Sequence, residues 1–347
     1  MRYREALYIA MKNAMKNSDN TIIVGQGVTD FKGVFGTTTG LKEKYPDRVI
    51  ETPVAEDSSL GICIGASLGG LYPINTHIRA DFSLLAFNQL INIAAKYKYM
   101  FGGLFEVPLM LRLVVGRSWG QGAQHSQSLQ SLLSHIPGLT VLMPSTPWSI
   151  LSSYNHAIRN FKGPIIMLEH RLMYELEFDQ KVMNEMSDPF SSRLEKKGND
   201  LTIIATSIMV LEAKRAAIYL ETLGFSIEII DLHSISHPSY DLIKKSVRKT
   251  GRLLIADTSW KAYGVCAEMS RIICEEDPGM LNAPIRTIGM AATPCPTAKA
   301  LEDMYYPDVN DLINTSLELL IGKVKHGFNL PEKKSMTDFY KHFKGPF

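Results

Sequence analysis

The stretch at residues 49–73, VIETPVAEDSSLGICIGASLGGLYP, places two acids, Glu56 and Asp57, before a run of small and apolar residues. Three glycines follow, one per helical turn on a single face: Gly61, Gly65 and Gly69. Glycine costs about 1 kcal/mol relative to alanine inside a helix, so three on one face predict close packing against another backbone. An acid before such a helix either favours its N-terminal dipole or is a functional carboxyl held in an apolar pocket.

The length and composition predict a two-domain cytoplasmic protein. The 347 residues exceed one comfortable hydrophobic core. The chain is 45% hydrophobic and 21% charged, and its formal net charge of +2 offers no broad basic surface. It has no arginine- or lysine-rich run with interleaved aromatics, so a nucleic-acid partner is not expected. No apolar run approaches the roughly 18 residues of a membrane span.

The cysteines agree with a reducing cytosol. They are scattered without a CxxC spacing, which predicts neither a zinc site nor a disulfide framework. The four are Cys63, Cys266, Cys274 and Cys295.

Strand-like and helical patterns alternate along the chain. Alternation of this kind indicates parallel sheets with helices on both faces, so we expect an α/β fold of two doubly wound domains. Residues 83–100 and 147–160 are predicted helices. Apolar runs predict strands that begin near residues 21, 49, 72, 108, 140, 164, 201, 226 and 253.

Composition sets the expected boundaries. Residues 1–180 form the first domain, and a linker at 181–200 loses apolar periodicity and gains charge and serine. Residues 201–325 form the second domain, followed by a polar tail at 326–347. The end of the tail, DFYKHFKGPF, has four aromatics among basic residues, which predicts either a docking segment or a mobile terminus.

Four segments carry a resemblance to a known family. VIETPVAED, ADFSLLAFNQLINIAAKYKYMFGG, GAQHSQSLQSLLSHIPGLTVLMPSTP and KTGRLLIADTSW resemble the β subunit of thiamine diphosphate-dependent 2-oxoacid dehydrogenases, of the pyruvate and branched-chain type. The resemblance runs in consistent order from about residue 3 to 322. It implies a transketolase-like pyrimidine-binding domain followed by a domain like the transketolase C-terminal domain.

The resemblance assigns Glu56 to the cofactor. Thiamine diphosphate requires an imino tautomer of its aminopyrimidine, and a carboxyl bonded to the far ring nitrogen drives that shift. An apolar pocket raises the pKa of such a carboxyl and lets it share a proton. The alternative is an acid that only favours the helix N-terminus.

Two further side chains follow from the same resemblance. Phe82 in RADFS matches the aromatic residue that packs against the aminopyrimidine, the alternative being plain core packing. His125 in GQGAQHSQS matches the histidine that faces the substrate and assists proton transfer during acyl transfer, which suits a group that titrates near neutrality. His135, ten residues later, is interpreted as structural.

Metal binding is expected mainly outside this chain. The resemblance implies that Mg²⁺ bridges the diphosphate to a Gly-Asp-Gly loop, which this sequence lacks, so a separate α subunit should supply it in an α2β2 assembly. Backbone oxygens bind a potassium ion in relatives, and Ala157, Ile158, Asn160 and Lys162 occupy those positions here. Lys162 brings a positive charge close to that ion's position.

The sequence departs from the family at several positions. Gln26 and Gly27 in GQGV stand in place of two acids, LHSISHPSYD replaces an arginine-containing turn, and ADTSW replaces an acidic pair. These changes leave three functions open. The first is a 2-oxoacid dehydrogenase that passes its acyl group to a lipoyl-bearing acyltransferase. The second is an acyloin-forming or transketolase-like enzyme that passes its carbanion to an aldehyde. The third is a non-catalytic β-like subunit that binds partners.

Overall fold

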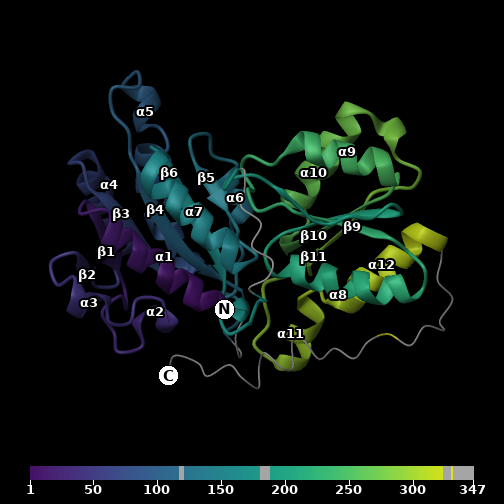
Figure 1. Ribbon diagram of the computed structural model, residues 1–347, viewed down its shortest axis with the longest axis horizontal. Helices are drawn as coiled ribbons and strands as arrows, with labels where there is room; N and C mark the ends of the chain where they lie inside the picture. Colours follow the sequence, from purple (N-terminus) through teal and green to yellow (C-terminus); the bar gives the residue numbers. More distant parts are fainter. Residues whose placement is uncertain (117–120, 180–187, 323–329, 331–347) are drawn as a thin grey trace. The chain divides into compact units, whose positions relative to one another are not determined.

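Six parallel strands form the sheet of the first unit in a computed structural model that describes residues 1–116, 121–179, 188–322 and 330 (Figure 1). Their order across the sheet is β2-β1-β3-β4-β6-β5. Every strand except the edge strand β2 is buried along its length, as expected when helices cover both faces. The strands are β1 (Thr21–Gly25), β2 (Val49–Glu51), β3 (Tyr72–His77), β4 (Leu109–Val115), β5 (Thr140–Leu142) and β6 (Pro164–His170).

Two layers of helices enclose this sheet. Helices α1 (Tyr3–Asn17) and α7 (Pro147–Asn160) pack on each other over one face. Helix α4 (Glu56–Leu68) covers the other face, where Asn75 of β3 donates a hydrogen bond to Ser59 of α4 at 2.7 Å. Short helices complete the unit: α2 (Gly33–Gly36), α3 (Leu41–Lys44), α6 (Gln130–Ser134) and η3 (Arg171–Met173).

The segment after β3 differs from the single helix predicted for residues 83–100. It forms a 3-10 helix, η1 (Ala80–Ala86), then a π-helix, η2 (Asn88–Ala94), then α5 (Tyr97–Met100). The hydroxyl of Ser83 donates to the carbonyl of Ala80 at 2.6 Å. Such short side-chain bonds to the backbone compete with regular α-helical hydrogen bonds, and apolar periodicity does not reveal them.

The second unit has its own sheet of five strands in the order β11-β10-β8-β9-β7, in which only the edge strand β7 is antiparallel. Helix α8 and helix α12 pack together on one apolar cluster of this unit. Its strands are β7 (Arg193–Lys196), β8 (Leu201–Ala205), β9 (Ile227–Asp231), β10 (Leu253–Trp260) and β11 (Arg286–Met290). Its helices are α8 (Ile208–Thr222), α9 (Tyr240–Thr250), α10 (Val265–Glu276), η4 (Pro278–Met280), α11 (Lys299–Tyr305) and α12 (Val309–Ile321).

The unit boundaries differ from the predicted ones in two places. The second unit begins at Ser191, and β7 lies inside the range 181–200 that we expected to be a linker. β7 is short, charged and antiparallel, so it lacks the apolar run that marks a buried strand. Residues 121–126, which we expected in the first domain, group with the second unit. The tail at 331–347 lies outside the described residues.

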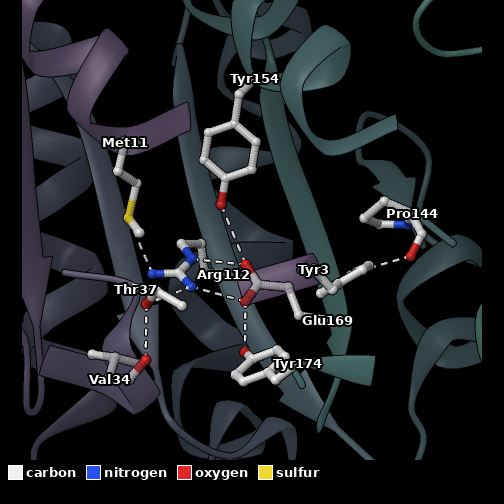
Figure 2. Close-up of polar contacts among 9 residues, drawn as sticks. All are labelled: Tyr3, Met11, Val34, Thr37, Arg112, Pro144, Tyr154, Glu169 and Tyr174. Carbon is white, nitrogen blue, oxygen red and sulfur yellow. Dashed lines mark hydrogen bonds and ion pairs between the residues drawn. The ribbon is translucent and has the colours of Figure 1, made fainter. Parts of the chain in front are cut away.

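A buried ion pair joins two neighbouring strands of the first sheet (Figure 2). Arg112 of β4 donates to both carboxylate oxygens of Glu169 of β6, at 2.7 and 2.8 Å, and neither side chain is exposed. Tyr154 of α7 and Tyr174 donate to the same carboxylate at 3.2 and 2.7 Å. Burial opposes the charged form of Arg112, but Glu169 outweighs it and raises the pKa of the guanidinium.

The remaining donors of Arg112 reach the layer of helices above it. One terminal nitrogen bonds Thr37 and the other contacts the sulfur of Met11 on α1, both at 3.2 Å. The pair therefore ties β4, β6, α1 and α7 together on the face opposite α4. In the described part of the chain, no helix has the length and apolar character that a membrane span requires.

Replacing Glu169 by glutamine should destabilise the first unit by about 3–5 kcal/mol, because Arg112 would keep a buried charge without its partner. Scanning calorimetry should show this as a lower midpoint for one unfolding transition. Glu175→Gln is the matched control. Its partners Arg2 and Arg4 are partly exposed, so the loss there should stay within about 1 kcal/mol. Equal effects of the two variants would contradict the structural role of the buried pair.

Candidate functional site

Glu56 is the first residue of α4 and is almost completely buried, with 2% of its surface exposed. Its Oε1 atom accepts a hydrogen bond from the side-chain amide of Gln26 at 2.9 Å. Its Oε2 atom is also buried, and no described residue donates to it. The carboxyl is therefore oriented from one side and has one oxygen available for a ligand.

The loop after β1 explains how Gln26 reaches Glu56. Gly25 has φ of +150°, and a side chain there would collide with the Thr76 carbonyl on β3. Only glycine fits this close approach of the two strand ends. Next, the backbone N–H of Gly27 donates to Glu51 at 2.5 Å. The two departures from the family's acids thus have separate roles: Gln26 bonds Glu56, and Gly27 bonds Glu51.

A polar layer lies directly below Glu56 between α4 and the sheet. Asn75 bonds Ser59, one helical turn after Glu56, and also donates to the Val24 carbonyl at 3.2 Å. His77 ends β3 two residues after Asn75 and is 1% exposed. Burial lowers the pKa of His77 to about 4, although the nearby charge of Glu56 opposes this shift. Sequence reasoning missed His77 because a lone histidine at a strand end has no motif.

The glycine-stepped face of α4 does not pack against another backbone of the described chain. A Cβ atom at Gly61 would meet the Gln89 side chain, and one at Gly65 would meet nothing within 4 Å. Ile62, on the same helix, is 63% exposed. The close packing that the three glycines predict is therefore absent within the described residues, and this face is open to a partner.

Phe82 lies on η1, which packs against α4 in the same unit as Glu56. Its side chain is 36% exposed, so plain core packing does not account for it. The preceding residue, Asp81, is buried and accepts a hydrogen bond from the backbone N–H of Gln127 at 3.0 Å. Asp81, which sequence reasoning also missed, anchors the chain two residues after His125.

His125 lies in a turn where its backbone N–H donates to the carbonyl of Gly122 at 3.4 Å. Gly122 contacts Thr297, which places this turn with the second unit. His135 is exposed and follows α6 in the first unit. An exposed side chain makes few packing contacts, so the structural role of His135 stays a prediction.

The residues of the predicted potassium site lie in the last turn of α7. Ala157 is buried, Ile158 is partly buried, and Asn160 ends the helix. Carbonyls in a last helical turn lack helical partners and can bind a cation, so the site stays a prediction. Across the described ranges, no three histidine, cysteine or acidic side chains converge as metal ligands would.

Comparison with known proteins assigns each of the two units to a known domain family. The pyrimidine-binding domain of transketolase matches residues 1–177, and the transketolase C-terminal domain matches residues 191–312. A mitochondrial pyruvate dehydrogenase E1 component subunit beta-2 from Oryza sativa is 36% identical over 91% of this chain and 85% of that protein. The chain belongs to the transketolase-like E1 β-subunit family.

A second relative resembles this E1 β subunit in sequence, and a solved structure resembles it in fold. The β subunit of acetoin:2,6-dichlorophenolindophenol oxidoreductase from Cupriavidus necator is 33% identical over 91% of this chain and 96% of that protein. A split gene transketolase, described as an inactive β4 tetramer, superposes with a TM-score of 0.76 at 20% identity, over 93% and 99% of the two chains. The predicted family and the fold of two α/β domains are confirmed, and the protein is a β subunit of the thiamine diphosphate-dependent 2-oxoacid dehydrogenase type.

Gln26→Glu should make the stability of this E1 β subunit depend on pH. The substitution places two carboxyls at hydrogen-bond distance, so the pair must share a proton and one of its pKa values rises. A carboxyl with a raised folded pKa keeps its stability below about pH 4.3 and loses it as pH rises. The variant should therefore be less stable than the parent by about 1–3 kcal/mol at pH 7–8 and approach it near pH 4.

Chemical denaturation at several pH values measures this difference. Gln26→Leu is the control, because it removes the amide donor without adding a titrating group. A Gln26→Glu deficit that stays constant from pH 4 to pH 8 would exclude a shared proton between residues 26 and 56.

Proposed function

We propose that Glu56 forms the pyrimidine side of a thiamine diphosphate site that an α subunit completes, in an α2β2 enzyme that oxidatively decarboxylates a 2-oxoacid. The observation that carries this proposal is the buried Oε2 atom of Glu56, which no described residue bonds. A buried polar atom without a partner is costly, and a ring nitrogen of the cofactor is a partner of fitting chemistry. The buried carboxyl of Glu56 therefore fits the aminopyrimidine of thiamine diphosphate, the cofactor that the family uses.

Glu56 would hold a proton between its Oε2 atom and the ring nitrogen. Gln26 fixes the carboxyl by donating to Oε1, and an amide cannot take the proton from the acid. Glu56 is 2% exposed, so a ring nitrogen bound there would meet its carboxyl away from bulk water. When bound, thiamine diphosphate supplies the carbon nucleophile that attacks the 2-oxoacid.

An exposed apolar surface supports a separate α subunit. On α4, η1 and the segment around α5, several large apolar side chains are exposed, which is unusual for a surface that stays in water. The surface consists of Ile62, Leu68, Leu84, Leu85, Tyr99, Met100, Leu104 and Phe105. Figure 1 shows α5 at the far end of this unit from the N-terminus. We infer that the α subunit covers this surface and supplies the Mg²⁺ ligands, which the sequence lacks.

His125 would act later in the reaction than Glu56. A histidine can give or take a proton near neutral pH, which suits transfer of the acyl group to a lipoyl disulfide. One lipoyl sulfur takes the acyl group and the other takes a proton, so the disulfide is reduced as the substrate is oxidised. A lipoyl-bearing acyltransferase is therefore the proposed acceptor, and a cytoplasmic location remains a prediction.

Acyloin cleavage is the second candidate function. The relative from Cupriavidus necator is named for acetoin, an acyloin, and is nearly as similar in sequence to this chain as the pyruvate dehydrogenase β subunits are. Assays of the αβ enzyme with acetoin and with 2-oxoacids, each with a lipoyl acceptor and with a dye, separate the two functions.

The isolated β subunit should not bind thiamine diphosphate measurably, because the ligands that hold Mg²⁺ and the diphosphate lie on the α subunit. Calorimetric titration with the cofactor and Mg²⁺ should give no heat signal for this chain and a saturable signal once α is added. Tight binding by the β subunit alone would refute the divided site.

Glu56→Gln should leave cofactor binding only modestly weaker but slow exchange of the thiazolium proton by about 10²–10⁴-fold, because the shared proton is lost. Decarboxylation should fall by the same factor. His125→Ala should keep proton exchange and lose acyl transfer. Hydrogen–deuterium exchange at the cofactor, followed by NMR, separates the two steps.

The matched control is Asp57→Asn, since Asp57 is the exposed neighbour of Glu56 in the first turn of α4. It should change stability by at most about 1 kcal/mol through the helix dipole and leave exchange intact. If a folded Glu56→Gln complex exchanged the thiazolium proton at the normal rate, Glu56 would only stabilise the start of α4, as Asp57 does.

A further inference from the structure

His77 brings a second buried polar side chain to the site of Glu56. It is the last residue of β3, and strand alternation puts its side chain on the same face of the sheet as that of Asn75. Asn75 bonds Ser59, so this face is the one that α4 covers. Neither ring nitrogen of His77 has a hydrogen-bond partner among the described residues.

The spacing of the two elements pairs His77 with Glu56. Ser59 follows Glu56 by three residues, which puts both on one side of α4, and Asn75 precedes His77 by two residues on one side of β3. Helix and strand run in opposite directions because α4 connects the parallel strands β2 and β3. The bonded pair Ser59–Asn75 therefore lies one layer below the pair Glu56–His77.

The imidazole of His77 is neutral in this environment. Burial lowers its pKa to about 4, and Glu56 is close enough for its charge to raise that value in part. Arg79 follows two residues later, and its Nη1 atom donates to the Ile78 carbonyl at 3.2 Å. A neutral imidazole carries one N–H donor and one acceptor nitrogen. It can therefore donate to a carboxylate without adding a charge.

We propose that His77 is a positioning residue for Glu56, whose second carboxyl oxygen is joined to the His77 imidazole through one bridging water. A carboxylate oxygen has two lone pairs, so Oε2 can accept from that water and still face a ligand. With Gln26 on Oε1, the carboxyl is then held from two sides and stabilised when it has given its proton to the cofactor's ring nitrogen. This inference rests on the proposed function of Glu56.

A purely structural histidine makes a different prediction. If His77 only fills space, an apolar residue should serve as well or better, because a buried imidazole with unused bonding capacity is unfavourable. If His77 positions Glu56, glutamine should preserve its function, since the amide keeps a donor and an acceptor, whereas leucine should not.

The first test uses the full-length β subunit alone. NMR of ¹⁵N-labelled histidine at pH 7 should show His77 as a neutral imidazole with one dominant tautomer. Glu56→Gln should shift both ring nitrogens of His77 and change the tautomer ratio. His135→Gln, which removes an exposed imidazole, should leave the His77 signals unchanged. Signals of His77 that are identical in the parent and in Glu56→Gln would overturn the proposal.

The second test uses the αβ complex with thiamine diphosphate and Mg²⁺. His77→Leu should weaken cofactor binding by a factor of about 5–10, the equivalent of one neutral hydrogen bond, and reduce the near-ultraviolet circular dichroism signal of the imino tautomer. His77→Gln should restore both. Parent-like affinity and signal in a folded His77→Leu complex would overturn the proposal.

The two tests distinguish failure of the proposed function of Glu56 from failure of the proposed role of His77. If the parent complex does not bind the cofactor, the proposed function of Glu56 fails, and the NMR result still decides whether His77 and Glu56 interact. If the parent complex binds and His77→Leu behaves like it, the function stands and the role of His77 is wrong.

Discussion

The bidentate bond between Arg112 and Glu169 holds the first unit in the arrangement on which its site depends. The pair lies on the neighbouring strands β4 and β6, and the same carboxylate accepts bonds from Tyr154 and Tyr174. Removing either charge would leave the other buried and unpaired, so the intact network ties α1 and α7 to the sheet. With that face fixed, the strands can carry the site on the opposite face and at their carboxyl ends.

The opposite face has features that suit contact with something outside the described chain. Polar pairs such as Ser59–Asn75 close the inner side of α4, while Ile62 is 63% exposed and a Cβ atom at Gly65 would meet nothing within 4 Å. The glycines are costly in an isolated helix. A closely approaching surface would offset that cost, which supports the proposal that α4 both carries Glu56 and contacts an α subunit.

Much of the fold could be predicted from the sequence, and the failures have identifiable physical causes. The buried strands follow from apolar runs, and the structure gives α7 the bounds 147–160 that the sequence predicts. The strand β7 was missed because an antiparallel edge strand does not need an apolar run. The 3-10 and π segments after β3 were missed because side-chain bonds such as that of Ser83 are invisible to periodicity.

In the candidate site, too, some residues could be predicted from a sequence motif and others only from the fold. Glu56 could be found because a family motif surrounds it, but the roles of Gln26 and His77 depend on strand ends that only the fold brings together. Replacing an acid by Gln26 removes a competing charge from beside Glu56 and keeps a hydrogen-bond donor there. A single carboxyl among an amide and a neutral imidazole can share its proton with a ligand without a second acid to take it. The departure at residue 26 is therefore compatible with the proposed role of Glu56 as a lone functional carboxyl, and under that proposal His77 is the second group that would position it.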